Sequence, residues 1–198
     1  TLSLYILLTL TALFLTINFS PTVTCPSPAI AVFPSFFTAT IVYAFLMIIT
    51  GYNHLDGVMD MADGVMVHGE PERKIRVMKD SSVGSGGVAT LFLVASLTIA
   101  GIYNILDYNF IIGIIICEML AKTSLLTTAL LSKPLTPGIG SYFINETTPS
   151  KYFISTAIIT TFAFLLGGLV GIFGALGAII SGTIIAVIAK RNFVLANG

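Results

Sequence analysis

Apolar runs make up most of this chain and are separated by short polar or proline-rich stretches. Apolar runs of about 20 residues recur, and a helix of that length crosses the hydrocarbon core of a bilayer. The pattern therefore predicts an all-α fold, a polytopic integral membrane bundle of about six transmembrane helices. The predicted spans are residues 1–19, 35–51, 87–106, 110–131 and two within 152–189, divided near Gly167, Gly168 and Gly171.

Turn-forming residues mark the loops between these spans. Prolines fill residues 20–34, a tight turn is indicated near Asp107, and prolines and glycines interrupt residues 132–151. The last span carries a row of small residues, which favours close helix packing over a passage for a ligand; they are Gly171, Gly174, Ala175, Gly177 and Ala178. We treat residues 1–198 as a single transmembrane domain.

Basic residues are distributed unevenly between the two sides of this predicted bundle. Eight of the nine lie in loops after the second, fourth and sixth spans: Arg73, Lys74, Arg76, Lys79, Lys133, Lys151, Lys190 and Arg191. Loops on the cytoplasmic side of membrane proteins carry the excess of Lys and Arg. We therefore expect a multi-pass protein of the cell membrane, surrounded by lipid, whose residues 51–87 face the cytoplasm.

Composition adds to this picture by excluding some kinds of partner and site. The chain is 9% charged and its net charge is zero, whereas soluble domains carry about 25% charged residues. Without a basic field, no nucleic-acid partner is expected. Cys25 and Cys117 show neither the spacing of metal ligands nor a disulfide framework.

Residues 51–87, called the polar island here, hold ten of the 18 charged residues and both histidines. Within it, Asp56, Asp60 and Asp63 are spaced four and three apart, so all three share one face of a helix. Like charges so placed repel one another unless a cation offsets them. Carboxylates together with phosphate oxygens are preferred ligands of Mg²⁺. We expect a Mg²⁺ site here, although a solvated acidic face is the alternative.

Other residues of the island suit a phosphorylated substrate. The stretch from Asp80 and Ser81 through Gly84 to Gly87 would offer backbone N–H groups at a helix start, and Asp80 would either join the metal ligands or cap that helix. Arg76 and Lys79, in a short amphipathic helix, would bind either anionic lipid or a nucleotide substrate. Gly57 and Gly64 would allow a bulky ligand to approach the backbone, or would serve helix packing.

Two further candidates are ionisable residues at or near the membrane. His54 precedes Asp56 by two positions and would act as a general base or orient the substrate, with a purely structural histidine as the alternative. Lys122 lies inside the fourth span, one turn after Glu118. Charges within a membrane helix are rare and usually functional. We expect Lys122 to bind a phosphate from a cytoplasmic cavity, with a structural ion pair to Glu118 as the alternative.

The island as a whole resembles a known family. The resemblance rests on Gly51-Tyr-Asn-His-Leu-Asp-Gly57, the aspartates at 60 and 63 with Gly64, and Lys79-Asp80-Ser81 followed by Gly84 and Gly87. This combined pattern is similar to that of the cobalamin synthases, the adenosylcobinamide-GDP ribazoletransferases. The similarity extends more weakly from the first span to Lys190 and Arg191.

The resemblance implies an integral membrane, Mg²⁺-dependent enzyme of a late step of vitamin B12 assembly. In that reaction a ribose hydroxyl of α-ribazole or its 5′-phosphate attacks adenosylcobinamide-GDP, GMP leaves, and adenosylcobalamin or its 5′-phosphate forms. Members of the family usually have more sequence ahead of the first span, and a Gly-Asp motif with another apolar helix after the point where this chain stops. At position 122 the family pattern leads us to expect Arg, a better bidentate phosphate ligand than Lys.

Two alternatives stay open at this point. A CDP-alcohol phosphotransferase would also use an aspartate-rich helix and Mg²⁺, but the Ala-Arg element of that motif is absent here. A membrane cation transporter would use the same aspartates as an ion path, but the charges cluster at one edge rather than along the spans. The preferred acceptor, the number of metal ions, the identity of the base and a homo-oligomer also stay open.

Overall fold

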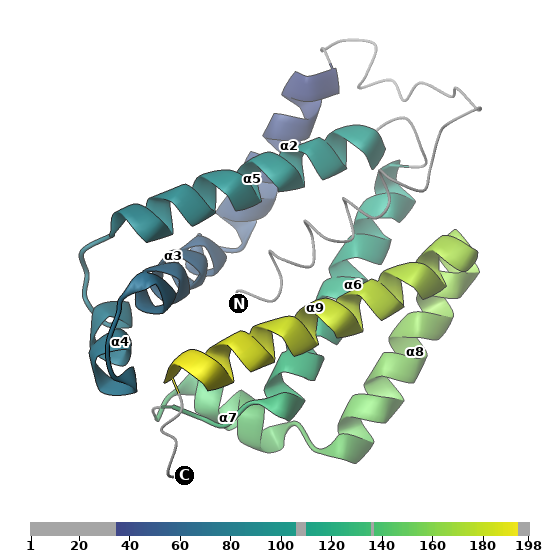
Figure 1. The fold of residues 1–198 in the computed structure, drawn as a ribbon. Coiled ribbons are helices and arrows are strands. Elements are labelled where there is room, and N and C mark those ends of the chain that lie inside the picture. Colours follow the sequence, from purple (N-terminus) through teal and green to yellow (C-terminus); the bar gives the residue numbers. More distant parts are fainter. Residues whose placement is uncertain (1–34, 106–109, 136, 194–198) are drawn as a thin grey trace.

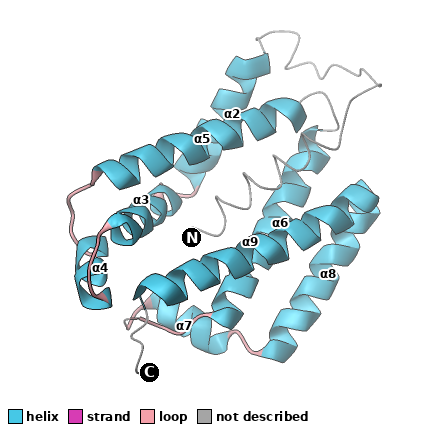
Figure 2. Cartoon of the chain, viewed as in Figure 1, coloured by secondary structure: helices cyan, strands magenta, loops and turns pink. Residues whose placement is uncertain are grey.

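The computed structural model describes residues 35–105, 110–135 and 137–193. The first predicted span and the proline-rich loop after it lie outside these ranges. Throughout the described ranges the chain consists of helices joined by turns and loops, without a strand (Figure 2). The helices in chain order are α2 (Ser35–Ile49), α3 (Asn53–Met66), α4 (Pro71–Met78), α5 (Ser85–Ile105), α6 (Phe110–Leu131), α7 (Ile139–Glu146), α8 (Pro149–Gly167) and α9 (Leu169–Phe193) (Figure 1).

Four of these helices are long and apolar enough to cross a membrane. They are α5, α6, α8 and α9, with 21, 22, 19 and 25 residues. Their bounds match the predicted third to sixth spans, and those of α6 coincide with the predicted residues 110–131. The structure therefore confirms the prediction of an all-α, membrane-embedded bundle.

The predicted second span is shorter than expected because the chain turns sharply after it. Helix α2 has 15 residues, and α3 follows it at an angle of 90°. Gly51 and Tyr52 both adopt left-handed backbone conformations at the bend, with φ of 64° and 59°. These conformations end α2, and in its last turn the Thr50 hydroxyl donates to the carbonyl oxygens of Leu46 and Met47. As a result, α3 runs back along α5 (Figure 1), and α2 and α3 together make a fifth candidate span when this bent pair is counted as one broken span.

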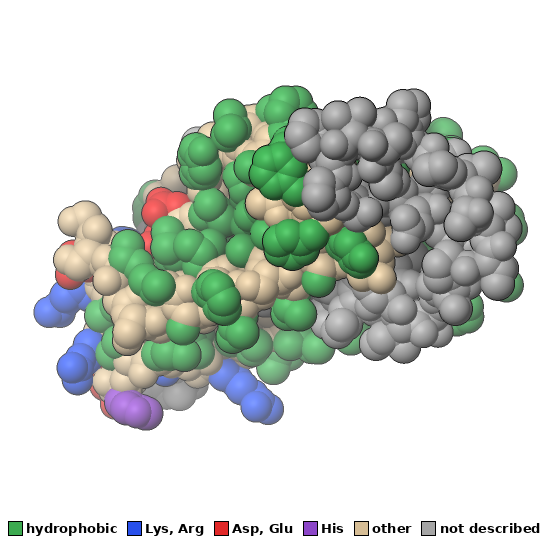
Figure 3. Space-filling model, turned by 90° about the horizontal axis from the view of Figure 1, so that it is seen from above, with side chains coloured by type: hydrophobic (Ala, Val, Ile, Leu, Met, Phe, Trp, Pro, Cys, Tyr) green, Lys and Arg blue, Asp and Glu red, His purple; other side chains and the backbone are tan. Residues whose placement is uncertain are grey.

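Large apolar side chains cover the outside of the spanning helices. Phe92 on α5, Ile111 on α6 and Leu165 on α8 are 71%, 66% and 70% exposed. Lys, Arg, Asp, Glu and His side chains gather instead at one end of the face seen in Figure 3. Such an apolar outer surface is stable in lipid but not in water, in agreement with a membrane-embedded protein.

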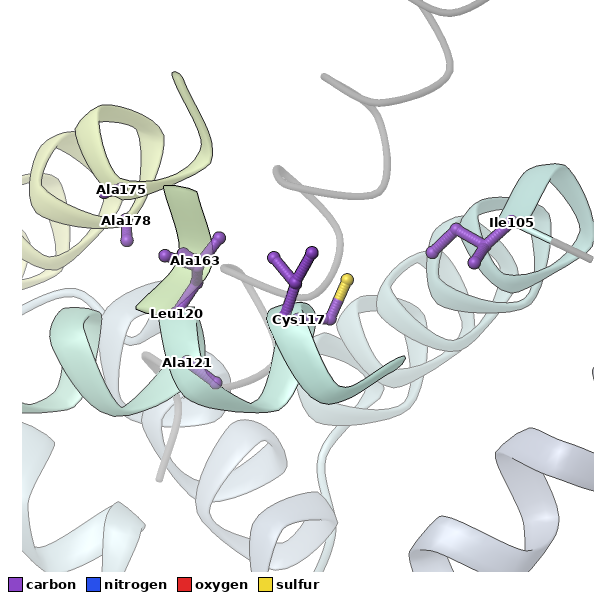
Figure 4. Packing of buried hydrophobic residues seen from close by; sticks show 8 residues of the cluster. Ile105, Cys117, Leu120, Ala121, Ala163, Ala175 and Ala178 are labelled. Carbon is purple, nitrogen blue, oxygen red and sulfur yellow. The ribbon is translucent and has the colours of Figure 1, made fainter. Parts of the chain in front are cut away.

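The inner packing of α6, α8 and α9 depends on small side chains. Leu120 and Ala121 of α6 lie in one buried cluster with Ala163 of α8 and with Ala175 and Ala178 of α9 (Figure 4). A side chain at Gly171 would meet the backbone of Ala163 on α8, and one at Gly182 would lie 2.6 Å from the carbonyl oxygen of Ser124 on α6. The small residues of α9 therefore serve close helix packing, as the sequence predicted, except Gly177, where an added methyl group would meet nothing within 4 Å.

Hydroxyl groups add hydrogen bonds between the same three helices. The hydroxyl oxygens of Ser124 and Ser181 lie 3.1 Å apart, and the Thr128 hydroxyl donates to the carbonyl oxygen of Gly182 at 3.1 Å. The hydroxyl oxygens of Thr127 and Tyr152 lie 3.2 Å apart. Interhelical hydrogen bonds of this kind hold membrane helices together where lipid supplies no hydrophobic driving force.

A second group of helices forms the end that carries the charges. Helix α3 packs along α5, and α4 folds back against α3 and reaches the last turn of α9 (Figure 1). The ammonium group of Lys74 donates to the Asn192 side chain at 2.6 Å. Gly64 is buried beneath Met78 and Phe193. The basic residues of α4 and of the α9 terminus, far apart in sequence, therefore lie at the same end of the molecule.

We expect Gly182→Ala to lower the thermal stability of the protein, because the added methyl group has no room against α6. Overpacking of this kind costs about 1–3 kcal/mol. The matched control is Gly177→Ala on the same helix, where an added methyl group meets nothing within 4 Å. Thermal unfolding in detergent would measure both. Equal midpoints for the two variants would contradict the packing described for α9.

Candidate active site

Helix α3 carries the acidic stripe on an otherwise apolar body. Val58 is buried in the contact with α2 and α5, whereas Asp56 is exposed and Asp60 and Asp63 are half-buried. The helix ends where Val67 adopts an extended conformation. The three carboxylates thus lie on a helix whose opposite, buried side packs against α2 and α5.

The carboxylates of this stripe repel one another. Burial raises the pKa of Asp60, and the charges of Asp56 and Asp63 raise it further. Among the described residues the one ion pair joins Lys151 to Glu146, at 2.7 Å and in exposed positions. The acidic stripe therefore has no basic side chain in ion-pair contact within the described ranges, and a bound cation would relieve the repulsion.

Asp63 makes two short hydrogen bonds to the start of α5. Its Oδ2 accepts the backbone N–H of Gly84 at 2.7 Å, and its Oδ1 accepts the N–H of Gly87 at 2.7 Å. Gly84 directly precedes the first residue of α5 and Gly87 is the third residue of that helix, so both N–H groups belong to the set that a helix start leaves without an intrahelical partner. A carboxylate from α3 thus caps α5 from outside.

Glycines make room for this contact. A side chain at Gly84 would strike the Asp63 carboxylate, and one at Gly87 would lie 2.7 Å from Asp63 Oδ2. A side chain at Gly86 would lie 2.6 Å from the Met66 sulfur. The need for glycine at these positions is therefore explained by packing, without a ligand. The N–H groups that the sequence assigned to phosphate bind Asp63 in this structure.

The residues just before α5 form a local turn. The Asp80 Oδ1 accepts the backbone N–H of Ser82 at 3.1 Å and the Ser82 hydroxyl at 3.0 Å. Ser81 is exposed beside them. Of the two roles left open for Asp80, capping of α5 belongs to Asp63. A part for Asp80 and Ser81 in binding metal or substrate stays a prediction.

The basic side chains near α4 differ in whether they contact other residues or are exposed. Lys74 is engaged with Asn192, whereas Arg76 and Lys79 at the end of α4 are exposed. Arg76 and Lys79 are therefore accessible to an anion, as is the exposed Arg73 of the same helix. Gly64 is explained by packing under Met78 and Phe193, and Gly57 is half-buried on α3.

Lys122 and His54 come from different helices. Lys122 is exposed on α6 and Glu118 is half-buried one turn away, and no ion pair joins them in the described part of the chain. Burial lowers the pKa of His54, and the charge of Lys122 contributes to this lowering. A common site for His54 of α3 and Lys122 of α6 stays a prediction.

The donor set fits Mg²⁺ bound jointly with a substrate. No group of three or more His, Cys, Asp or Glu side chains in the described ranges is placed to enclose a metal ion. Mg²⁺ commonly takes one or two carboxylates and completes its shell with water and substrate phosphates. Asp56 and Asp60 meet that need, since their carboxylates accept no hydrogen bond from any other residue that the structure describes. Asp63 and Asp80 as further ligands stay predictions.

Sequence reasoning missed two contacts of this end of the molecule. It did not find Asp63 as the cap of α5, although the glycines at 84, 86 and 87 signal a close approach to that helix start. It also missed Asn192 as the partner of Lys74. No local signal marks that pair, because its members are 118 positions apart.

Comparisons with known proteins point in one direction. The sequence model of the cobalamin-5-phosphate synthase family matches residues 5–198. The adenosylcobinamide-GDP ribazoletransferase of Methanococcoides burtonii is 35% identical over 175 residues, which cover 83% of this chain and 65% of the relative. The proteins of that name from Methanosarcina mazei and Pyrococcus furiosus are 34% and 32% identical, over 84% and 76% of this chain and 66% and 64% of their own length. The chain thus spans just under two thirds of these relatives. No solved structure matches it.

We expect Asp60→Asn to raise the thermal stability of the metal-free protein at neutral pH. The raised pKa means that the carboxyl group of Asp60 favours the folded state only while protonated. That contribution is complete below the ordinary aspartate pKa of about 3.9 and is lost as the pH rises through the higher pKa of the folded protein. The stability gained by Asp60→Asn should therefore grow as the pH rises from about 4 to 7.

Thermal unfolding in detergent with a chelator, at pH steps across this interval, would measure the gain. The control is Glu72→Gln, which removes an exposed carboxylate from α4, outside the acidic stripe. A gain of the same size at both ends of the interval would contradict the repulsion within the stripe.

Proposed function

Because this chain belongs to the cobalamin-5-phosphate synthase family, we propose that it acts as an adenosylcobinamide-GDP ribazoletransferase. The adenosylcobinamide phosphate group passes from adenosylcobinamide-GDP to a ribose hydroxyl of α-ribazole or its 5′-phosphate. A new bond forms between that oxygen and the phosphorus next to the cobinamide. The bond from this phosphorus to the bridging oxygen of the diphosphate breaks, and GMP leaves. The family match across residues 5–198 is the observation that carries the proposal.

The acidic stripe suits the charge of this substrate. We place the metal-binding role on Asp56 and Asp60, whose carboxylates remain available and repel each other. Mg²⁺ held there would neutralise charge that develops on the diphosphate during displacement. Asp56 and Asp60 would thereby also orient the substrate at the end of α3.

Basic and acid–base groups would complete the site. Arg76 and Lys79 are exposed at the end of α4 and would bind the phosphate that leaves with GMP. Lys122 would meet the diphosphate from α6. His54 is the candidate to accept the proton of the attacking hydroxyl, because a neutral imidazole is the form in which a base works and the pKa of His54 is lowered.

The same arrangement supports a location. We propose that the protein lies in the cell membrane with the polar island facing the cytoplasm. The support is that α4 and the end of α9, which carry most of the basic loop residues, meet through Lys74 and Asn192 at one end of the bundle. An excess of Lys and Arg at one end is typical of the cytoplasmic side.

The direct test is GMP release by the purified protein in lipid, supplied with adenosylcobinamide-GDP and α-ribazole 5′-phosphate. We expect release to require Mg²⁺ and to fall at least about a hundredfold in Asp56→Asn and Asp60→Asn, because charge stabilisation of the transition state carries most of such a reaction. Glu72→Gln is the matched control and should keep full activity. Near-normal turnover in both aspartate variants would contradict the proposal of a metal site on α3.

A charge swap tests Lys122. In the described chain Lys122 has no ion pair with Glu118, so we expect the combined change Glu118→Lys and Lys122→Glu to abolish GMP release, since it places a carboxylate where the diphosphate arrives. Lys122→Arg should retain activity, because a guanidinium group also binds phosphate. An active swapped protein would instead make Lys122 a structural partner of Glu118.

A further inference from the structure

We infer that Asp63 is a positioning residue of this site rather than a metal ligand: it fixes the start of α5 against the acidic face of α3. The inference rests on the proposed function for its catalytic part. Its structural part rests on the two hydrogen bonds of 2.7 Å from the N–H groups of Gly84 and Gly87 to the Asp63 carboxylate.

The geometry of the carboxylate supports this role. Each oxygen of Asp63 accepts one N–H group, and each bond has the short length of a charge-assisted hydrogen bond. The helix dipole of α5 adds to the attraction, because negative charge is favoured at a helix N-terminus. Asp56 and Asp60 accept no such bonds in the described chain. Of the three aspartates of the stripe, only Asp63 is thus fixed by backbone hydrogen bonds within the described chain.

The surrounding sequence supports it independently. Gly84 occupies the cap position of α5, where Ser, Thr, Asp or Asn would ordinarily supply a side-chain oxygen. Gly84 has no side chain to do so, and any side chain there would displace Asp63. The helix start is thus built to receive a carboxylate from another helix, and the acceptor arrives from 21 positions earlier in the chain.

The consequence for the site is spatial. The contact joins the two ends of the segment 63–84, which contains α4 with Arg76 and Lys79 and the turn of Asp80 and Ser81. If Asp63 releases α5, the chain that carries these phosphate-binding candidates is held to the helix of Asp56 and Asp60 at one end, through Met78 over Gly64, and is free to shift at the other. Misplacement of reacting groups by about 1 Å costs about a hundredfold in rate.

Hydrogen exchange tests the contact without any substrate. In Asp63→Asn the peptide that covers residues 84–87 should exchange at least about tenfold faster, because the amide side chain replaces one acceptor oxygen by a donor. Ser85→Ala, at the first position of α5, should leave the exchange unchanged. Wild-type exchange in Asp63→Asn would overturn the inference even if the protein were no transferase.

Kinetics then separate positioning from metal binding and from plain stability. We expect Asp63→Asn to lower kcat by about tenfold to a hundredfold, with the Mg²⁺ concentration for half-maximal GMP release within twofold of wild type. Asp60→Asn should shift that Mg²⁺ concentration upward. Gly84→Ala, which displaces the Asp63 carboxylate without removing it, should reproduce the loss of kcat at an unchanged Mg²⁺ requirement.

Gly182→Ala serves as the control for lost stability, because its clash lies between α6 and α9. At a temperature where every variant is folded, it should keep the kcat of wild type. The inference is overturned if Asp63→Asn raises the Mg²⁺ requirement as Asp60→Asn does, or if faster exchange at residues 84–87 leaves kcat unchanged.

Discussion

The attachment of α5 to the Asp63 carboxylate is the contact on which the charged end of this molecule depends. Hydrogen bonds to a charged group contribute about 1.5–3 kcal/mol each, and leaving a buried N–H without a partner costs a similar amount. The two bonds to Gly84 and Gly87 hold a spanning helix against the helix that carries the acidic stripe. Helix α4 lies between these two points in the chain, and its Lys74 extends the attachment to Asn192 on α9.

Close approach to a helix backbone is the other constraint, and glycines make it possible in two places. Gly84 and Gly87 admit the Asp63 carboxylate to the start of α5, while Gly171 and Gly182 admit α9 to α8 and α6. A glycine inside a helix costs about 1 kcal/mol relative to alanine. In lipid, where helices associate through packing rather than the hydrophobic effect, the closer helix packing offsets that cost. The interhelical bond between Ser124 and Ser181 lies in the same tightly packed region.

The sequence predicted the spanning helices well because length and apolar character decide them, and α6 has the predicted bounds. It also predicted the short amphipathic helix that became α4. It did not predict the 90° bend after α2, since nothing in Tyr52 signals a left-handed conformation that non-glycine residues rarely adopt.

For the site, the sequence predicted which residues share a face but not what each one contacts. The four- and three-residue spacing placed Asp56, Asp60 and Asp63 on one face. From the sequence, all three were assigned the same metal-binding role. Their difference comes from a tertiary contact, 24 positions away for Gly87, that no local pattern encodes. The spacing of Glu118 and Lys122 likewise allowed an ion pair that the described chain does not form.

An experimental structure of the protein in lipid, with Mg²⁺ and an adenosylcobinamide-GDP analogue that resists cleavage, would show what Asp63 contacts when metal and diphosphate are bound. We expect the Asp63 carboxylate still to accept the N–H groups of Gly84 and Gly87, while Asp56 and Asp60 bind the metal next to the diphosphate. A structure in which Asp63 binds the metal and a phosphate takes its place on those N–H groups would contradict this expectation.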